Sequence, residues 1–475
     1  MARQAIHSDL KTKNTRLEKK TMSFSALVDR FKRFNTIWDS RFEDVTRTTW
    51  LRTTYRDFCA GLIVALTAIP MAMGFAMAMG LQPEQGIIAS AVAGIIGGIF
   101  GGSKYQVYGP TAAFIPVIGA LITKYGVASG GDRAAAHGFL VLCSVCAGVI
   151  LLVLALLGMG RYAQKVPKSI VMGFTIGISI TIAFSSIGEA LGLKHEIHGD
   201  FVHKLALIWE HLAEFNGYAC CLALLTFGMA RYLLRLSIFI PAPLLALGLC
   251  TMLAETVFAG KGISLVADRY GHISTSRLVF TPPCLPPVTG AMILDLSYFV
   301  LAIVFVSGVE SLLCSSLADQ MANNRRTQYS PDKEFWGQGL MQILTPLING
   351  FPCTGALART AISINVGAVS PLGGAFKSGL VIFFAIFLAP YIEKVPMACI
   401  GGILLWVACS MVRPAEIRLV WNHNRFHAFL MVCTAVLVPL TDFLTGVCSA
   451  LVMYAVLRKF LDKPPANRNL IQSLL

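Results

Sequence analysis

The chain has 475 residues, of which 55% are hydrophobic and only 13% are charged, and its formal net charge is +14. Soluble domains carry about a quarter charged residues, so the composition excludes an ordinary soluble protein and indicates a polytopic membrane protein. The positive charge does not indicate nucleic-acid binding, because the Lys and Arg residues gather at the ends of apolar segments instead of on one soluble face.

The chain begins with a polar, basic stretch, residues 1–50, which we expect to form a cytoplasmic tail. Apolar windows then follow at 58–80, 135–158, 170–190, 217–235, 238–259, 296–315, 373–390, 396–412 and 427–460. Each approaches or exceeds the ~20 residues that span a bilayer. The last window is interrupted near Pro439 and Asp442 and is long enough for two spans.

Positively charged clusters predict the number of spans. They lie at 3–56, 161–168, 231–235, 325–333, 413–425 and 458–468. Loops rich in Lys and Arg stay on the cytoplasmic side, so an even number of spans must separate successive clusters. Counting spans 1–4, 5–6, 7–8, 9–12 and 13–14 satisfies this at every cluster. We therefore expect fourteen transmembrane segments in the plasma membrane or the cell inner membrane, with both termini cytoplasmic.

Two short apolar segments stand out, because neither is long enough to cross a bilayer. One begins at "GPTAAF" (109–114) and runs from 111 to about 123, and the other begins at "TGALART" (354–360) and ends near 366. A shift of 242 residues lays Pro110 on Pro352 and 58–80 on 300–322. With seven spans per half, the second half must be inverted. Inverted repeats with paired short helices are typical of transporters that bind substrate at the bilayer midplane.

The predicted fold is therefore an all-α polytopic membrane protein with two inverted repeats of seven spans. The expected divisions are residues 1–50 as the tail, 51–265 as the first repeat with an external loop to about 295, 296–460 as the second repeat, and 461–475 as a cytoplasmic tail.

The beginnings of the two short helices predict an anion site. The first backbone N–H groups of a helix have no intrahelical partner, and in the membrane such donors must face a cavity, water or a ligand. Each helix N-terminus carries about half a positive charge, so two that face each other attract an anion. Arg359 would add a full charge in the first turn of the second short helix. The alternative is that Arg359 only neutralises a nearby acid, notably Glu310.

Glu310 interrupts an apolar span about halfway along. A carboxylate inside the membrane must be paired, protonated or bound to a cation. Two interpretations stay open, a coupling site for H+ or Na+ and a structural ion pair with Arg359. We expect no other metal site, no cofactor and no enzymatic activity, because no catalytic set, metal-spaced cluster or phosphate-binding loop lies at a suitable depth.

At these residues the chain resembles the sulfate permease family of anion transporters, over most of 40–460. The resemblance lies in "AIPMAMGFAMAMGL" (68–81), "GPTAAF", "VPKSIVMGFTIGISI" (166–180), "VESLLCSSLADQM" (309–321) and, most specifically, residues 337–374. It implies a core domain and a gate domain, two half-helices that meet at mid-membrane, and a homodimer.

The resemblance also implies roles for individual positions. The substrate would lie between the N-termini of the third and tenth helices, in contact with the following residues: Phe75, Thr111, Ala112, Gly355, Ala356, Leu357, Ala358 and Arg359. Glu310 takes the acidic position associated with cation coupling. Met71 departs from the glutamine of many sulfate-type members and brings the start of this helix closer to the bicarbonate-transporter branch. Members usually continue into a cytoplasmic STAS domain, which would begin at 461–475.

The expected function is secondary active transport of a small oxyanion such as bicarbonate, sulfate or a dicarboxylate, coupled to H+ or Na+. Two alternatives use the same fold. A passive anion channel or exchanger would conduct without coupling, and a nucleobase permease would use Glu310 and Phe75 to bind a base. Arg359 and the two helix N-termini favour an anion over a nucleobase.

Overall fold

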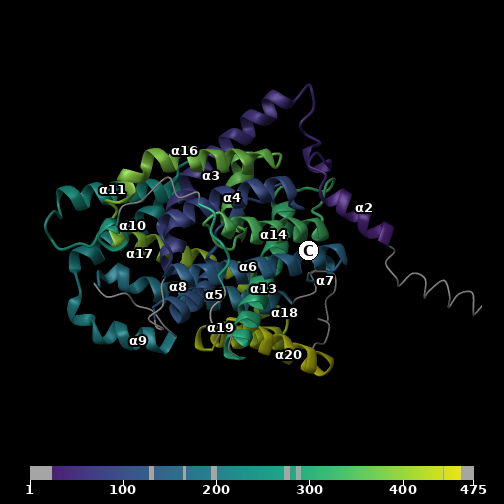
Figure 1. The fold of residues 1–475 in the computed structure, drawn as a ribbon. Coiled ribbons are helices and arrows are strands. Elements are labelled where there is room, and N and C mark those ends of the chain that lie inside the picture. Colours follow the sequence, from purple (N-terminus) through teal and green to yellow (C-terminus); the bar gives the residue numbers. More distant parts are fainter. Residues whose placement is uncertain are drawn as a thin grey trace, which may run out of the picture.

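The structure of this chain, a computed structural model, describes residues 24–127, 133–163, 167–193, 201–271, 279–284, 290–441 and 443–461. The expected tail at 461–475 lies outside the described residues apart from Leu461, and so do the first 23 residues. Figure 1 shows one bundle of helices, from which α2 (Phe24–Phe34) projects at one side.

Fourteen helical segments in the described part of the chain correspond to the fourteen expected spans, seven in each half. The first half contains α3 (Trp50–Ala78), α4 (Pro83–Phe100), a half-helix built from η2 (Ala112–Phe114), α5 (Ile115–Ile122) and η3 (Thr123–Val127), then α6 (Arg133–Leu156), α8 (Lys168–Leu191), α10 (Gly217–Leu236) and α11 (Ala242–Thr256). The second half contains α13 (Gly290–Met321), α14 (Pro331–Leu347), α15 (Leu357–Val366), α16 (Leu372–Ile392), α17 (Met397–Met411), α19 (Arg425–Leu440) and α20 (Phe443–Leu461).

Shorter helices connect these segments. They are α2, η1 (Ser40–Phe42), α7 (Gly160–Ala163), α9 (Phe201–Glu210), η4 (Leu212–Glu214), α12 (Val266–Tyr270) and α18 (Pro414–His423).

Both halves follow one plan, which confirms the predicted inverted repeat of seven and seven segments. In each half two long helices, α3 and α4 or α13 and α14, lead into a two-residue strand and then a half-helix. The exact register differs from the expected shift of 242, which would lay Ala112 on Thr354, because the second half-helix begins three residues later at Leu357. The predicted break in the last apolar window is also confirmed, since α19 ends at Leu440 and α20 begins at Phe443.

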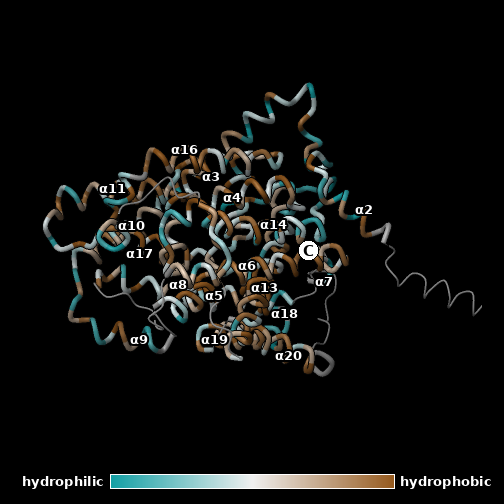
Figure 2. The backbone as a smooth tube through the Cα atoms, viewed as in Figure 1, coloured by the Kyte–Doolittle hydropathy of each residue, from teal (hydrophilic) through white to brown (hydrophobic). Residues whose placement is uncertain are grey.

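The outer surface is apolar, as a bilayer requires. Figure 2 shows hydrophobic stretches along most of the helices, α16 among them. On α16 the side chains of Phe383, Ile386 and Phe387 are each more than half exposed. Among the described residues, seven helices are long and apolar enough to cross a membrane. Other segments, α11, α15 and α19 among them, are shorter.

The one β-sheet within the described residues has two strands and lies at the centre of the helical bundle. Strands β1 (Tyr108–Gly109) and β2 (Thr354–Gly355) pair antiparallel, with Tyr108 opposite Gly355 and Gly109 opposite Thr354. Non-helical backbone inside a membrane must find hydrogen-bond partners within the protein. The pairing supplies them, and it fixes the starts of the two half-helices to each other.

The chain before α3 is anchored on the ends of the membrane helices. The ring of Phe34 packs on Trp336 of α14 with the ring centroids 5.8 Å apart. Arg41 donates hydrogen bonds to the carbonyl oxygens of Gly98 and Ile99, at 3.3 and 2.7 Å. These carbonyls belong to the last turn of α4, where no further helical N–H is available to bind them. Residues 24–49 therefore form a structured segment bound to the bundle.

Candidate functional site

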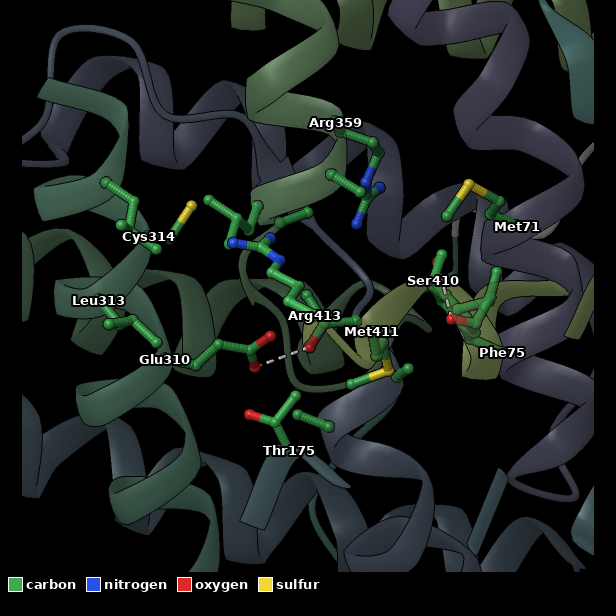
Figure 3. A pocket seen from close by; sticks show the side chains of 18 of the residues that line it. Met71, Phe75, Thr175, Glu310, Leu313, Cys314, Arg359, Ser410, Met411 and Arg413 are labelled. Atoms are coloured by element: carbon green, nitrogen blue, oxygen red, sulfur yellow. Dashed lines mark hydrogen bonds between the residues drawn. The ribbon is translucent and has the colours of Figure 1, made fainter. Parts of the chain in front are cut away.

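A cavity of about 150 Å³ lies where the two half-helices begin. One wall comes from α3, the two half-helices and α13, and the opposite wall comes from α8, α17 and α18. The lining residues are Met71, Phe75, Pro110, Thr111, Ala112, Ala113, Met172, Phe174, Thr175, Glu310, Leu313, Cys314, Leu317, Ala356, Leu357, Ala358, Arg359, Trp406, Val407, Ser410, Met411, Arg413 and Glu416. Figure 3 shows ten of these labelled around the cavity.

The half-helices present uncapped N-termini to this cavity. The residues at the two N-cap positions, Thr111 and Ala356, have extended backbones, and neither provides a side-chain hydrogen bond to the helix. The residues that line the cavity at these helix starts include Ala112 and Ala358, whose side chains are small. Because the first N–H groups of a helix have no intrahelical acceptor and the helix dipole is positive here, the arrangement can bind an anion without a titratable group.

Arg359 lies behind the same helix starts and is only 1% exposed. Its Nη2 atom donates to the carbonyl oxygen of Pro110. Its Nε and Nη1 atoms have no hydrogen-bond partner among the described residues. A Cβ added to Gly109 would lie 2.8 Å from Nη1, so the guanidinium is packed against this backbone. Arg359 therefore adds positive potential to the cavity from a fixed position.

Glu310 projects into the cavity from the middle of α13 (Figure 3). Its Oε2 atom accepts a hydrogen bond of 3.1 Å from the Thr111 hydroxyl. No ion pair joins Glu310 to Arg359 within the described residues, although both line the cavity. The contact with Thr111 ties the carboxylate to the start of the first half-helix, so a change in its charge acts directly on the anion site.

A polar ladder between α13 and α14 supports the site. Ser311 and the carboxylate of Glu334 are hydrogen-bonded, and Gln338 donates to Ser311 at 2.9 Å. One turn away, Gln342 donates to Ser307 at 2.7 Å. Such contacts between small and polar side chains hold membrane helices together.

Glu334 also binds the segment that leads into the first half-helix. Its carboxylate accepts hydrogen bonds from the Gly102 N–H at 2.7 Å, the Gln106 amide at 3.2 Å and the Tyr108 hydroxyl at 2.8 Å. The ladder therefore fixes residues 102–108 and, through β1, the position of the half-helix.

Seven of the eight predicted substrate contacts line the cavity together with Glu310. Gly355 does not. It lies in β2, and a Cβ at this position would be 1.8 Å from the Gln106 amide nitrogen. The residue is a glycine because the Gln106 side chain occupies the space, and the structure assigns it to packing instead of the cavity lining.

The sequence analysis did not single out several groups that the structure places at or beside the site. Thr175, Trp406, Arg413 and Glu416 line the wall opposite the half-helices. Lys377 of α16 is fully buried, and its ammonium donates to the carbonyl oxygens of Ser90 and Tyr108 at 2.5 and 3.1 Å. A single lysine within the apolar window 373–390 could have indicated from the sequence that this side chain has a partner inside the protein.

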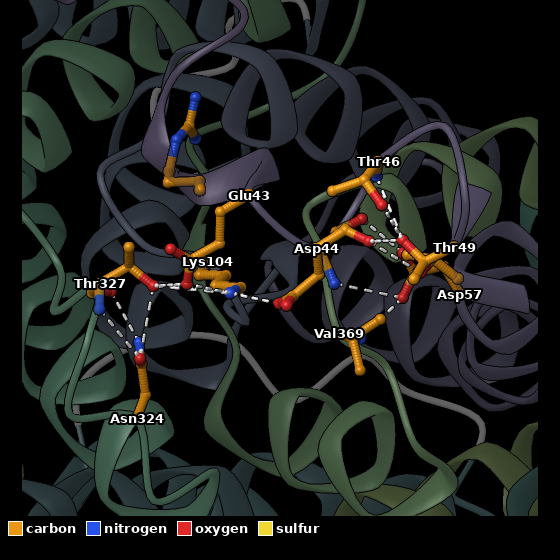
Figure 4. Close-up of polar contacts among 12 residues, drawn as sticks. Glu43, Asp44, Thr46, Thr49, Asp57, Lys104, Asn324, Thr327 and Val369 are labelled. Carbon is orange, nitrogen blue, oxygen red and sulfur yellow. Dashed lines mark hydrogen bonds and ion pairs between the residues drawn. The ribbon is translucent and has the colours of Figure 1, made fainter.

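A second cluster of charged side chains lies outside the cavity (Figure 4). Lys104 donates to Asp44 at 2.5 Å and to Glu43 at 3.1 Å, and Thr327 donates to Glu43 at 3.0 Å. The hydrogen bond from Lys104 lowers the pKa of Glu43 below its ordinary value of 4.5. Lys104 forms ion pairs with both Glu43 and Asp44, so this cluster anchors the segment before α3.

Comparisons with known proteins agree with this architecture. Residues 55–434 match the sulfate permease family. The Bacillus subtilis (strain 168) protein named "Putative sulfate transporter YvdB" is 34% identical over 401 residues, which cover 84% of this chain and 72% of YvdB. The bicarbonate transporter BicA of Picosynechococcus sp. is 26% identical over 406 residues, which cover 85% of this chain and 70% of BicA.

Solved structures show the same fold. The transmembrane domain of a cyanobacterium bicarbonate transporter BicA superimposes with a TM-score of 0.68 at 22% identity, covering 84% of this chain and 98% of that domain. The murine anion transporter Slc26a9 in its inward-facing state gives a TM-score of 0.73 at 15% identity, covering 86% of this chain and 68% of Slc26a9. With the family match extending over most of the described membrane segments, the chain belongs to the sulfate permease family.

Proposed function

We propose that this chain is a secondary active transporter of a small oxyanion, namely bicarbonate, sulfate or a dicarboxylate, and that it works by alternating access. One observation carries the proposal: two uncapped helix N-termini and the buried Arg359 converge on one cavity. Oxyanions accept hydrogen bonds from backbone N–H groups in this geometry. The sulfate and bicarbonate transporters among the relatives support the same class of substrate.

Coupling would follow from the position of Glu310. An ionised Glu310 places a negative charge beside the anion site, and repulsion weakens anion binding. A bound H+ or Na+ removes that charge, so cation and anion bind together. By linkage, each then raises the affinity for the other by the same factor. We further propose that the chain acts as a homodimer in the plasma membrane or the cell inner membrane with both termini cytoplasmic.

The direct test is uptake into proteoliposomes of labelled bicarbonate, sulfate and fumarate. Each anion is offered with an inward H+ gradient, an inward Na+ gradient, and neither. Accumulation of one anion under one gradient supports the proposal and identifies both substrate and coupling ion. Equal flux of an anion in all three conditions would instead favour a channel or exchanger. Transport of an uncharged nucleobase in place of every anion would favour the permease alternative.

Two variants connect transport to the cavity. Arg359→Ala removes a full charge from a buried position, and we expect at least about a tenfold loss of anion affinity. Glu310→Gln is expected to abolish gradient-driven accumulation while anion binding persists, because the glutamine is permanently uncharged. Glu255→Gln is the matched control, since Glu255 pairs with Lys394 on an exposed surface. Normal anion affinity in Arg359→Ala would contradict the role assigned to Arg359. Normal accumulation in Glu310→Gln would contradict the role assigned to Glu310.

A further inference from the structure

The cavity carries charged side chains on both of its walls, and the function proposed above uses only one pair. Arg359 and Glu310 belong to the wall built by α15 and α13. Arg413 and Glu416 belong to the opposite wall, at the start of α18. Figure 3 shows Arg413 among the side chains that surround the cavity, between Glu310 and Met411. A cation therefore faces the cavity from the wall that lacks the half-helices.

Exposure orders the two arginines along the cavity. Arg359 is 1% exposed, whereas the side chain of Arg413 is 38% exposed. Arg413 therefore lies nearer the mouth, on the path between the surrounding water and the half-helices. It belongs to the cluster 413–425 that the positive-inside rule assigns to the cytoplasmic side, so this mouth is expected to be the cytoplasmic one.

The partner of Arg413 is weakly held. Arg413 Nη1 donates to Glu416 Oε1 at 2.8 Å, and the side chain of Glu416 is 36% exposed. Among the described residues this is the one side-chain hydrogen bond of the guanidinium. Exposed pairs one helical turn apart contribute little to stability, so an incoming anion can replace the carboxylate. The guanidinium presents donors in a planar fork that matches two oxygens of one oxyanion.

The backbone at this point is fixed and adds to the positive potential. Arg413 precedes Pro414 and has an extended conformation, with φ −105° and ψ 100°. The ring of a following proline disfavours the helical alternative. Arg413 is also the N-cap residue of α18, a helix of ten residues, and no side chain caps it. Pro414 has no N–H, so the uncapped N–H groups of this helix begin at Ala415, close in the chain to Arg413.

We propose that Arg413 forms a mouth subsite that binds the oxyanion before it reaches the half-helices, with Glu416 as the internal anion that the substrate displaces. This inference rests on the proposed anion transport. The subsite belongs to the wall opposite the half-helices, so the substrate leaves it when it moves to the half-helices. The mouth subsite therefore changes how readily the anion is captured at one face of the membrane. It does not change the affinity of the site at the half-helices.

The test measures the KM for sulfate in inside-out and right-side-out membrane vesicles, at low and at physiological ionic strength. Arg413→Ala is expected to raise the KM about threefold to tenfold in inside-out vesicles, more at low salt, because steering by a charge at a mouth is screened by salt. The maximal rate should change by less than about twofold. Glu416→Gln should lower the KM, and the double variant should behave like Arg413→Ala, because Glu416 acts only through the arginine.

Arg418→Ala is the matched control, since Arg418 lies on the same helix, is exposed, and does not line the cavity. Its KM should equal that of the unaltered protein. Arg413→Lys keeps the charge without the fork and should raise the KM less than alanine does, and it replaces the alanine variant if the latter does not fold.

The proposal is overturned if Arg413→Ala leaves the KM unchanged, if Arg418→Ala raises it equally, or if both vesicle orientations change alike. In that last case Arg413 is part of the central site. Failure of the subsite differs from failure of the proposed function. If Arg359→Ala weakens transport and Arg413→Ala does not, only the subsite is refuted. If the unaltered protein transports no anion in the proteoliposome assay, the proposed function itself is refuted.

Discussion

Replacing Gly355 by alanine tests how the two repeats hold the half-helices in place. The backbone of Gly355 does not have a positive φ, so alanine can adopt its conformation. The cost comes from space alone. The new Cβ would lie 1.8, 2.4 and 3.0 Å from Nε2, Cδ and Cγ of Gln106, and the side chain of Gln106 must therefore move.

The magnitude follows from what Gln106 would lose. Its amide donates to Ser311 at 2.9 Å and to Glu334 at 3.2 Å, and its carbonyl accepts from Ser315. Two of these hydrogen bonds join neutral groups, worth about 0.5–1.5 kcal/mol each, and the one to the carboxylate is worth about 1.5–3 kcal/mol. The free energy of unfolding should therefore fall by about 2.5–6 kcal/mol if no bond is remade, and by less if Gln106 finds new partners.

The assay is thermal unfolding of the purified protein in detergent, together with sulfate binding. Gly379→Ala on α16 is the control, because no atom lies within 4 Å of a Cβ there. Alanine at that helical position should be neutral or stabilising by up to about 1 kcal/mol. We expect Gly355→Ala to melt clearly below Gly379→Ala and to bind sulfate more weakly, since β2 leads directly into α15. Equal melting temperatures for the two variants would refute the reasoning.

Three further predictions concern charged residues that do not line the cavity. Glu334→Gln replaces one of two accepting oxygens by an amide donor, so either the donors to Oε2, such as the Gly102 N–H, or those to Oε1, such as the Gln106 amide, lose their acceptor. The free energy of unfolding should fall by about 1–3 kcal/mol, and an unchanged melting temperature would contradict this. Lys377→Met removes a buried cation that binds the Tyr108 carbonyl, so we expect lower sulfate affinity by calorimetry. The melting temperature should change little, because the recovered cost of burying a charge offsets the lost hydrogen bonds. Burial alone would raise the pKa of Asp39, but the hydrogen bond from Lys333 and the charge of Arg41 outweigh it and lower the pKa below the ordinary 3.8. The anchoring of the segment before α3 should therefore be complete above about pH 4 and be lost as the pH falls through the lowered value. Asp39→Asn should make this segment protease-sensitive at pH 7, and resistance equal to that of the unaltered protein would count against the assignment.

The number and arrangement of the spans could be predicted from the sequence, because insertion depends on local properties. The hydropathy of each apolar window and the charge of each cluster can be evaluated from that segment of the sequence alone. Two spans nevertheless had no window of their own. The best window of α4 has a mean hydropathy of only 1.3 and is 78% buried. α14 carries Glu334, Gln338 and Gln342 four residues apart on one face. Helices surrounded by other helices can be polar, and hydropathy alone underestimates them.

The site could be predicted only in part. The short helices could be predicted because they are too short to span a bilayer. Arg359 and Glu310 could be predicted because each is a charged residue within an apolar segment. The role of Gly355 depends on Gln106, which is almost 250 residues away in the chain, and no local pattern contains that contact. The ladder was encoded as two stripes, at 307, 311 and 315 and at 334, 338 and 342. The side of the cavity that carries Arg413 depends on how α18 packs against α19 and α8, which is a property of the packed structure.

The pairing of β1 with β2 has a consequence for biogenesis. The two strands are separated by about 240 residues, which a ribosome adds in roughly 10–50 s. Throughout that interval the backbone at Tyr108 and Gly109 has no strand to pair with. The first repeat must therefore wait in the membrane, or in the insertion machinery, until the second half-helix arrives from the other side of the bilayer. A ribosome stalled just before residue 354 would have made nine of the fourteen membrane segments, α13 and α14 among them, and no substrate site.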